Sequence, residues 1–257
     1  MNWSDLLWRL RVVHGTGWAI YRADFPPGLL LLAIAPRVLG QALFFLLIAV
    51  MVTGEPSVAS IGAIAMTTFT ISQIGNVPLL DIISATLYRH RAGAVGVFRV
   101  LLARGVPYMC AGWAAFALTV GVLTPASGGG LSFDRLPAML VVSSIIAVSS
   151  GLAGLTASIV SAPSRNDTLV TNLVSYAIIA VGGAVVPVER LGDLSSIGSI
   201  LPMQHGISAL RAIESARPWG HQALLELAVG GAWLVVGWCA VRFLTHRART
   251  RGREDFA

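Results

Sequence analysis

Long apolar runs separated by short polar segments dominate the chain. A helix needs roughly 20 apolar residues to cross a bilayer core about 30 Å thick. Six runs approach or reach this length, at about Val38–Thr53, Val58–Leu80, Leu101–Leu123, Leu136–Val160, Leu169–Val186 and Ala223–Leu244. The first run has a possible extension back to Gly28, which we expect the Pro36–Arg37 pair to break. The pattern predicts an all-α, polytopic membrane protein with six transmembrane helices.

Two further segments have helical periodicity but carry too many charges to cross. Residues 3–13 place apolar side chains on one helical face, with Asp5, Arg9 and Arg11 mostly off it. Such a helix suits the inner membrane surface, either as a simple anchor or as a contact for a partner. Between residues 187 and 220, apolar positions step by three and four on both sides of Pro202. We expect two short amphipathic helices that dip into the outer leaflet and return.

These elements predict one transmembrane domain over residues 1–257. Its expected parts are an interfacial helix and linker (1–27), spans one to five (28–186), outer amphipathic helices (187–220), span six (221–245) and a basic tail (246–257).

The composition removes several alternatives. Hydrophobic residues make up 55% of the chain and charged residues only 12%, whereas a soluble domain carries about 25% charged residues. A water-soluble enzyme or a nucleic-acid-binding protein is therefore excluded, despite the net charge of +6. Cys110 and Cys239 both lie in apolar runs, so we expect two buried thiols and neither a disulfide framework nor a metal site.

The basic residues predict the orientation of the helices, because such residues stay in the cytoplasm during insertion. All 18 are arginines. With the amino terminus inside, fourteen of them lie at or near the cytoplasmic face, and only Arg135, Arg190, Arg211 and Arg217 lie outside. Both termini are therefore expected in the cytoplasm. The absence of lysine, with frequent Arg, Ala, Gly and Val, suggests a GC-rich bacterial genome and hence a bacterial inner membrane.

The chain lacks the residues of an ATP site or of a catalytic centre. A P-loop requires a lysine on the terminal phosphates, and the Gly-rich segment 127–132 lies in an expected outer loop with no strand before it. We therefore expect no enzymatic activity and no cofactor in this chain. Ser149 and Ser150 with His205 are a weak match to an intramembrane hydrolase. A carrier or channel that works without ATP is a further alternative.

Three stretches, combined with the topology, resemble the permease subunit of type-2 ATP-binding-cassette exporters. They are the charged stretch at 81–108, the Gly/Pro exit and "Pro…His…Leu-Arg" helix at 182–211, and the amino-terminal amphipathic helix. The resemblance covers nearly the whole chain. This family includes bacterial exporters of drugs, natural products and lipid-linked polysaccharides.

This resemblance implies a complex of two permeases, as a homodimer or with a related permease, and two ATPase subunits that bind ATP and Mg²⁺. It also implies that the first cytoplasmic loop docks on an ATPase subunit. There Tyr88 offers an aromatic anchor, while Arg89, His90 and Arg91 offer charge. Arg165, in the second cytoplasmic loop, is a further candidate for contact with the ATPase subunit. The alternative role of these arginines is to set the topology and to bind anionic membrane lipid.

The resemblance further implies a substrate pathway along the second and fifth spans. Its polar candidates are Thr68, Gln73, Asn76, Asn172 and Tyr176. Hydrogen bonding between helices is the alternative role for these residues. Few intramembrane charges favour a small amphipathic or apolar substrate, such as a drug, natural product, lipid or lipid-linked glycan. Arg37, expected near the inner entrance, would meet an anionic headgroup.

Overall fold

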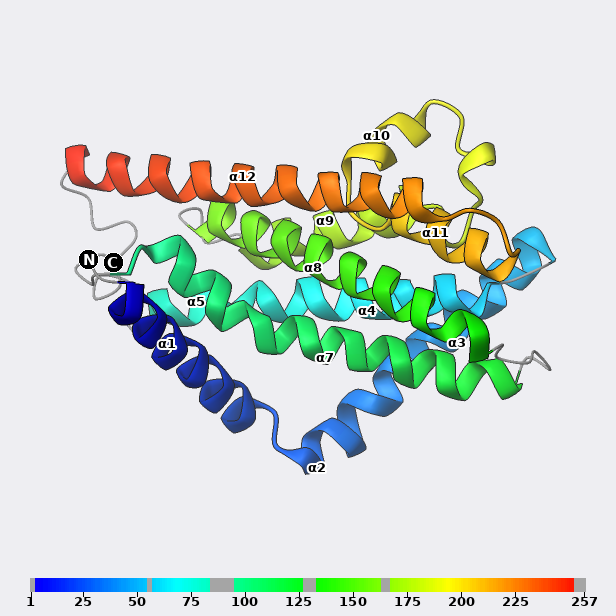
Figure 1. The fold of residues 1–257 in the computed structure, drawn as a ribbon, viewed down its shortest axis with the longest axis horizontal. Helices are drawn as coiled ribbons and strands as arrows, with labels where there is room; N and C mark the ends of the chain where they lie inside the picture. The colour runs from blue at the N-terminus through cyan, green and yellow to red at the C-terminus, as the bar shows by residue number, and fades with distance from the viewer. Residues whose placement is uncertain (1–2, 55–56, 84–94, 127–132, 163–166, 252–257) are drawn as a thin grey trace.

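The computed structural model describes residues 3–54, 57–83, 95–126, 133–162 and 167–251, and every regular element in these ranges is a helix. Five helical stretches there are long and apolar enough to cross a membrane: Pro27–Val52, Val58–Pro78, Val97–Ala126, Leu136–Ser161 and Gly220–Arg247. The longest of these helices lie side by side along the long axis of the molecule (Figure 1). The prediction of an all-α, multi-pass membrane protein is confirmed.

The first span begins earlier than its apolar pattern suggests. Helix α2 (Pro27–Leu29), a π-helical turn η1 (Leu30–Ile34) and α3 (Ala35–Thr53) follow one another without a break. The expectation that Pro36–Arg37 ends the helix is wrong, because the wider π-helical turn accommodates a proline that lacks an N–H donor. Arg37 therefore lies ten residues inside the helical run, which is about 15 Å from its start.

Three helices form the centre of the bundle. Helix α4 (Val58–Ile74) continues after Gly75 as α5 (Asn76–Ile83), and α4 packs against α7 (Val97–Ala126) and α8 (Leu136–Ser161). A short 3₁₀ turn, η2 (Phe133–Arg135), precedes α8.

Small residues bring α4 and α8 into close contact. A Cβ atom on Gly154 would lie 2.9 Å from the Cα atom of Ile71, so the backbones meet there without a side chain between them. One turn earlier, the hydroxyl of Ser150 lies 3.1 Å from that of Thr67. Ser150 and Gly154 thus serve helix packing, as small residues four apart do in membranes.

The fifth apolar run forms a shorter helix than expected. Helix α9 (Asp167–Val181) has 15 residues, or about 22 Å, and it ends before the expected boundary at Val186. Gly182 and Gly183 follow it, and Gly183 has a φ of +77°, which favours glycine and turns the chain out of the helix. Its apolar part, Leu169–Val181, is shorter than the five candidate spans, so a sixth crossing stays a prediction.

Short helices connect α9 to the last helix, α12 (Gly220–Arg251). They are η4 (Val188–Arg190), α10 (Leu194–Ile200) and α11 (Gln204–Glu214), so two helices do flank Pro202 as predicted. Helix α11 packs against α8 and α12. The dip into the outer leaflet stays a prediction.

Helix α1 (Trp3–Asp24) is twice as long as the amphipathic stretch at 3–13 suggested. It packs on α7 through its second half, where a Cβ on Gly17 would lie 3.0 Å from the Cα of Arg104. The rings of Tyr21 and Tyr108 meet edge-on at 5.3 Å. Figure 1 shows the start of α1 and the end of α12 at the same end of the bundle, opposite α11. Which end is cytoplasmic stays a prediction.

Candidate functional site

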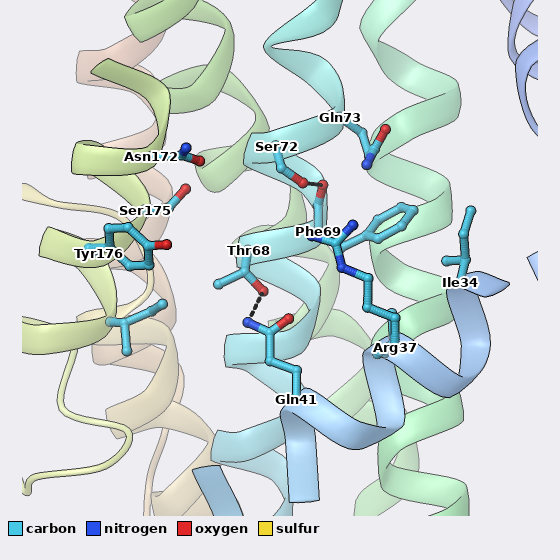
Figure 2. A pocket seen from close by; sticks show the side chains of 12 residues that line it. Ile34, Arg37, Gln41, Thr68, Phe69, Ser72, Gln73, Asn172, Ser175 and Tyr176 are labelled. Carbon is cyan, nitrogen blue, oxygen red and sulfur yellow. Dashed lines mark hydrogen bonds between the residues drawn. The ribbon is translucent and has the colours of Figure 1, made fainter. Parts of the chain in front are cut away.

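A cleft of about 130 Å³ lies between the first span, α4 and α9. Each helix contributes one stripe of side chains at helical spacing. The twelve lining residues are Ile34, Arg37, Val38 and Gln41 from the first span, Thr68, Phe69, Ser72 and Gln73 from α4, and Asn172, Ser175, Tyr176 and Ile179 from α9. Figure 2 shows Arg37 and Gln41 reaching from α3 toward α4, with the polar side chains of α9 across the cleft.

The cleft is polar, although the helices around it are apolar. Eight of its twelve lining residues have polar side chains, and several lie well inside their helices: Thr68 is ten residues from the start of α4. Polar groups at such a depth face a large desolvation cost unless another group satisfies them. The hydrogen bonds of these side chains therefore indicate which of them serve the fold.

Thr68 and Ser72 are satisfied by neighbouring groups. The hydroxyl of Thr68 donates to the carbonyl of Ile64 at 2.8 Å and accepts from Nε2 of Gln41 at 3.4 Å. Ser72 donates to the carbonyl of Phe69 at 3.0 Å (Figure 2). The Gln41–Thr68 contact joins α3 to α4. Thr68 therefore has the alternative role of hydrogen bonding between helices.

Five other lining residues have no such partner. Within the part of the chain that the structure describes, the side chains of Arg37, Gln73, Asn172, Ser175 and Tyr176 make no hydrogen bond or ion pair. Tyr176 is 67% exposed. These groups are available for a molecule that enters the cleft.

Five of the six predicted pathway and entrance residues line this cleft: Arg37, Thr68, Gln73, Asn172 and Tyr176. Asn76 does not line it: α4 ends at Ile74, and Asn76 begins the separate helix α5, where it is exposed. Gln41 and Ser72 also line the cleft but were not predicted to. Gln41 follows Arg37 by four residues and Ser72 follows Thr68 by four, so each shares a helical face with a predicted residue. Substrate contact by any of them stays a prediction.

The residues predicted to contact an ATPase subunit, Tyr88, Arg89, His90, Arg91 and Arg165, lie outside the described residues.

The described chain on either side of the first predicted cytoplasmic loop is joined by an ion pair. Asp81 on α5 accepts a hydrogen bond from Arg104 on α7, and their side chains are 4% and 9% exposed. The sequence predicts Arg104 only as one of the arginines near the cytoplasmic face and gives it no partner. Its partner precedes the loop by a few residues, so α5 and α7 are held together where the chain enters and leaves it.

The structure also tests the expectations about the two cysteines and about a Ser–His pair. Cys110 and Cys239 are free but exposed, not buried; an apolar run shows that a helix avoids water, but a face toward lipid is equally apolar. His205 contacts Gln222 and the carbonyl of Ser199, both at 3.2 Å. Ser149 instead donates to Glu226, so these groups do not form the Ser–His pair of a hydrolase.

Several membrane-length helices surround a polar cleft in which some side chains have no partner among the described residues, as expected of a membrane transport protein. The chain belongs to the family of ABC-2 type transporters, whose family model matches residues 28–215, more than two thirds of its length. No curated protein and no solved structure matches it significantly. It is therefore a multi-pass permease subunit of an ABC transporter, and this family implies an ABC ATPase as partner.

Proposed function

We propose that this chain is the permease half of an ATP-driven exporter and moves an amphipathic or apolar molecule through the cleft between α3, α4 and α9. The observation that supports this most is the set of polar side chains within apolar helices that line the cleft and have no partner among the described residues. A structural role alone would favour apolar residues at these positions, since each unpaired polar group costs stability.

A complete pathway requires a second permease, either a second copy of this chain or a related one. The cleft supports this because α9 forms one wall of it and also carries exposed side chains, among them Leu173 and Tyr176. A drug, natural product, lipid or lipid-linked glycan would pass between the two permeases and outward across the cell membrane of a bacterium.

A separate ATPase subunit supplies the energy by binding ATP and Mg²⁺. Closure of the ATPase pair moves the loops docked on it, and the helices tilt to open the pathway outward. This cycle works only if the two conformations differ in affinity for the ATP-bound partner and for the substrate. The ion pair between Asp81 and Arg104 supports a firm connection between the first cytoplasmic loop and the helices.

Co-purification and reconstitution test the proposal. The chain, expressed with the ATPase encoded beside it, should bring that ATPase along and should move a fluorescent amphiphile across vesicles only when ATP is present. Tyr88→Ala and Arg91→Ala should weaken the association, while Arg217→Ala, in the predicted outer segment, should not. Translocation by the chain alone would overturn the proposal in favour of a carrier or channel. Unchanged association would leave the loop arginines only their topological role.

A further inference from the structure

We infer that Arg37 makes the cleft selective for amphiphiles whose headgroup carries negative charge, such as a carboxylate or phosphate group. This inference rests on the proposed function, because it takes the cleft to be the substrate site.

Arg37 lies too deep to serve as a topological arginine. Such residues lie at the membrane–water interface, within the flanks of a span. Arg37 is ten residues from the start of the helical run that begins at Pro27, about 15 Å along its axis. It shares a helical face with Gln41, and Figure 2 shows both side chains directed toward α4. The guanidinium group is thus part of the cleft and not of the membrane surface.

The charge of Arg37 has no counter-charge in the cleft. None of the twelve lining residues is acidic, and within the described chain Arg37 makes no ion pair or hydrogen bond. Arg37 is exposed in the single chain, but a cation without a partner within a membrane span is costly, and such residues usually mark the route of a substrate or ion. The helix-joining role is already filled by Gln41 with Thr68. An anion that enters the cleft is therefore the partner that the site lacks.

The surrounding groups fit an oxygen-rich head with an apolar tail. A guanidinium group presents parallel N–H donors that match two oxygens of a carboxylate or phosphate. The amides of Gln73 and Asn172 and the hydroxyl of Tyr176 provide neutral donors. The volume of about 130 Å³ is below the range of about 300–1,000 Å³ for drug-sized ligands. The head alone fits, and the tail must follow the apolar helices.

A matched set of probes tests this selectivity. The complex of the chain with its ATPase is placed in nanodiscs of phosphatidylcholine. Three fluorescent amphiphiles with one identical alkyl chain then carry a carboxylate, a hydroxyl or a trimethylammonium head. The carboxylate probe should bind roughly tenfold more tightly than the other two, the difference that one charge-assisted pair supplies.

Substitutions of Arg37 identify the group responsible. Arg37→Gln should lower the affinity for the carboxylate probe roughly tenfold and that for the hydroxyl probe much less, while Arg37→Lys should restore part of the preference for the carboxylate. Arg22→Gln is the matched control, because Arg22 is exposed on α1 and does not line the cleft. Thermal unfolding of each variant checks that it folds. Equal affinities for the three heads, or an equal loss for all of them in Arg37→Gln, would overturn the inference.

Competition distinguishes the source of the anion. Displacement of the carboxylate probe by phosphatidylglycerol in the disc would support a lipid headgroup as the ligand, and displacement by inorganic phosphate would support a free anion. The ATP dependence of transport is measured separately. Equal affinities of the wild-type complex for the three heads, with ATP-driven transport intact, would refute only the role of Arg37. Selective binding without any effect of ATP refutes the proposed function.

Discussion

Asp81 and Arg104 form an ion pair of opposite charges in apolar surroundings. Both side chains are less than a tenth exposed. Removing one partner of a buried pair leaves an uncompensated charge and costs about 3–5 kcal/mol. We expect Arg104→Met and Asp81→Leu each to lower the free energy of unfolding by that amount, and the double variant to lose less than the two losses combined. Unfolding in detergent, arranged as a double-mutant cycle, measures this coupling.

Arg99→Met is the control for that cycle, because Arg99 is exposed on the same helix α7. Single variants of the pair that cost no more than this control would show that the contact contributes nothing to stability.

Glu214 at the end of α11 makes the stability of the outer segment depend on pH. Burial raises the pKa of its carboxyl above the ordinary 4.5, and hydrogen bonds from Ser57 and Ala59 with the charge of Arg211 offset this only in part. The folded state therefore holds the proton more tightly than the unfolded chain. This contribution is present below pH 4.5 and is lost as the pH rises through the raised pKa.

Glu214→Gln should accordingly reduce the fall in the free energy of unfolding between pH 4 and pH 7. Melting temperatures at both pH values, compared with those of Glu189→Gln at an exposed position of the same segment, measure the difference. Identical pH slopes for the wild type and Glu214→Gln would contradict this assignment.

Residue types identified half of the eight polar residues of the cleft but not the hydrogen-bonding state of each group. Polar residues in apolar runs selected Thr68, Gln73, Asn172 and Tyr176, and all four line the cleft. The sequence could not show that Thr68 is already hydrogen-bonded while the others have no partner among the described residues. That distinction depends on the relative rotation of neighbouring helices, which a single apolar run does not encode.

At the scale of elements, Glu226 attaches α11 to the last span. Its carboxylate, 0% exposed, accepts hydrogen bonds from the backbone N–H groups of Met203 at 2.8 Å and Gly206 at 3.0 Å, and from the hydroxyl of Ser149. The amides at the start of a helix have no partner within that helix. Glu226 on α12 supplies one to α11 and also contacts α8.

We expect Glu226→Ala to lower the free energy of unfolding by about 3 kcal/mol, since each buried donor left without an acceptor costs about 1–3 kcal/mol. Amide hydrogen exchange at residues 204–210 should become faster. Leu227→Ala, at the neighbouring exposed position, is the control. Exchange in Glu226→Ala as slow as in that control would show that α11 is held by its apolar face alone.

The boundaries of the elements were predicted least well where tertiary contacts decide them. The second, third, fourth and last apolar runs appear as long helices near their expected positions. The second half of α1 was missed because its helix is fixed by Gly17 and Tyr21 against α7, and no local pattern shows that contact. The expectation that Pro36 breaks the helix was wrong for a related reason, since the π-helical turn before it leaves no signal in the sequence.

For the whole molecule, the distribution of arginines predicts which end faces the cytoplasm. In a background with Cys110→Ser and Cys239→Ser, we expect a membrane-impermeant maleimide to label Ser127→Cys in intact cells, because position 127 lies in a predicted outer loop. Arg91→Cys should be labelled only after permeabilisation. The reverse pattern would invert the topology and would rule out docking of an ATPase on the loop at 84–94.

The open side of the cleft predicts where a second permease lies. On α9, Leu169 and Leu173 are 66% and 64% exposed and alternate with the cleft residues Asn172 and Ser175. In the same cysteine-free background, we expect Leu173→Cys to form a disulfide between two copies in membranes, because a bond forms only when the Cα atoms approach within about 7 Å. Val235→Cys, 57% exposed on α12, should stay monomeric. Cross-linking at 235 but not at 173 would place the partner on α12, leave the cleft facing lipid and remove the basis for a pathway shared between two permeases.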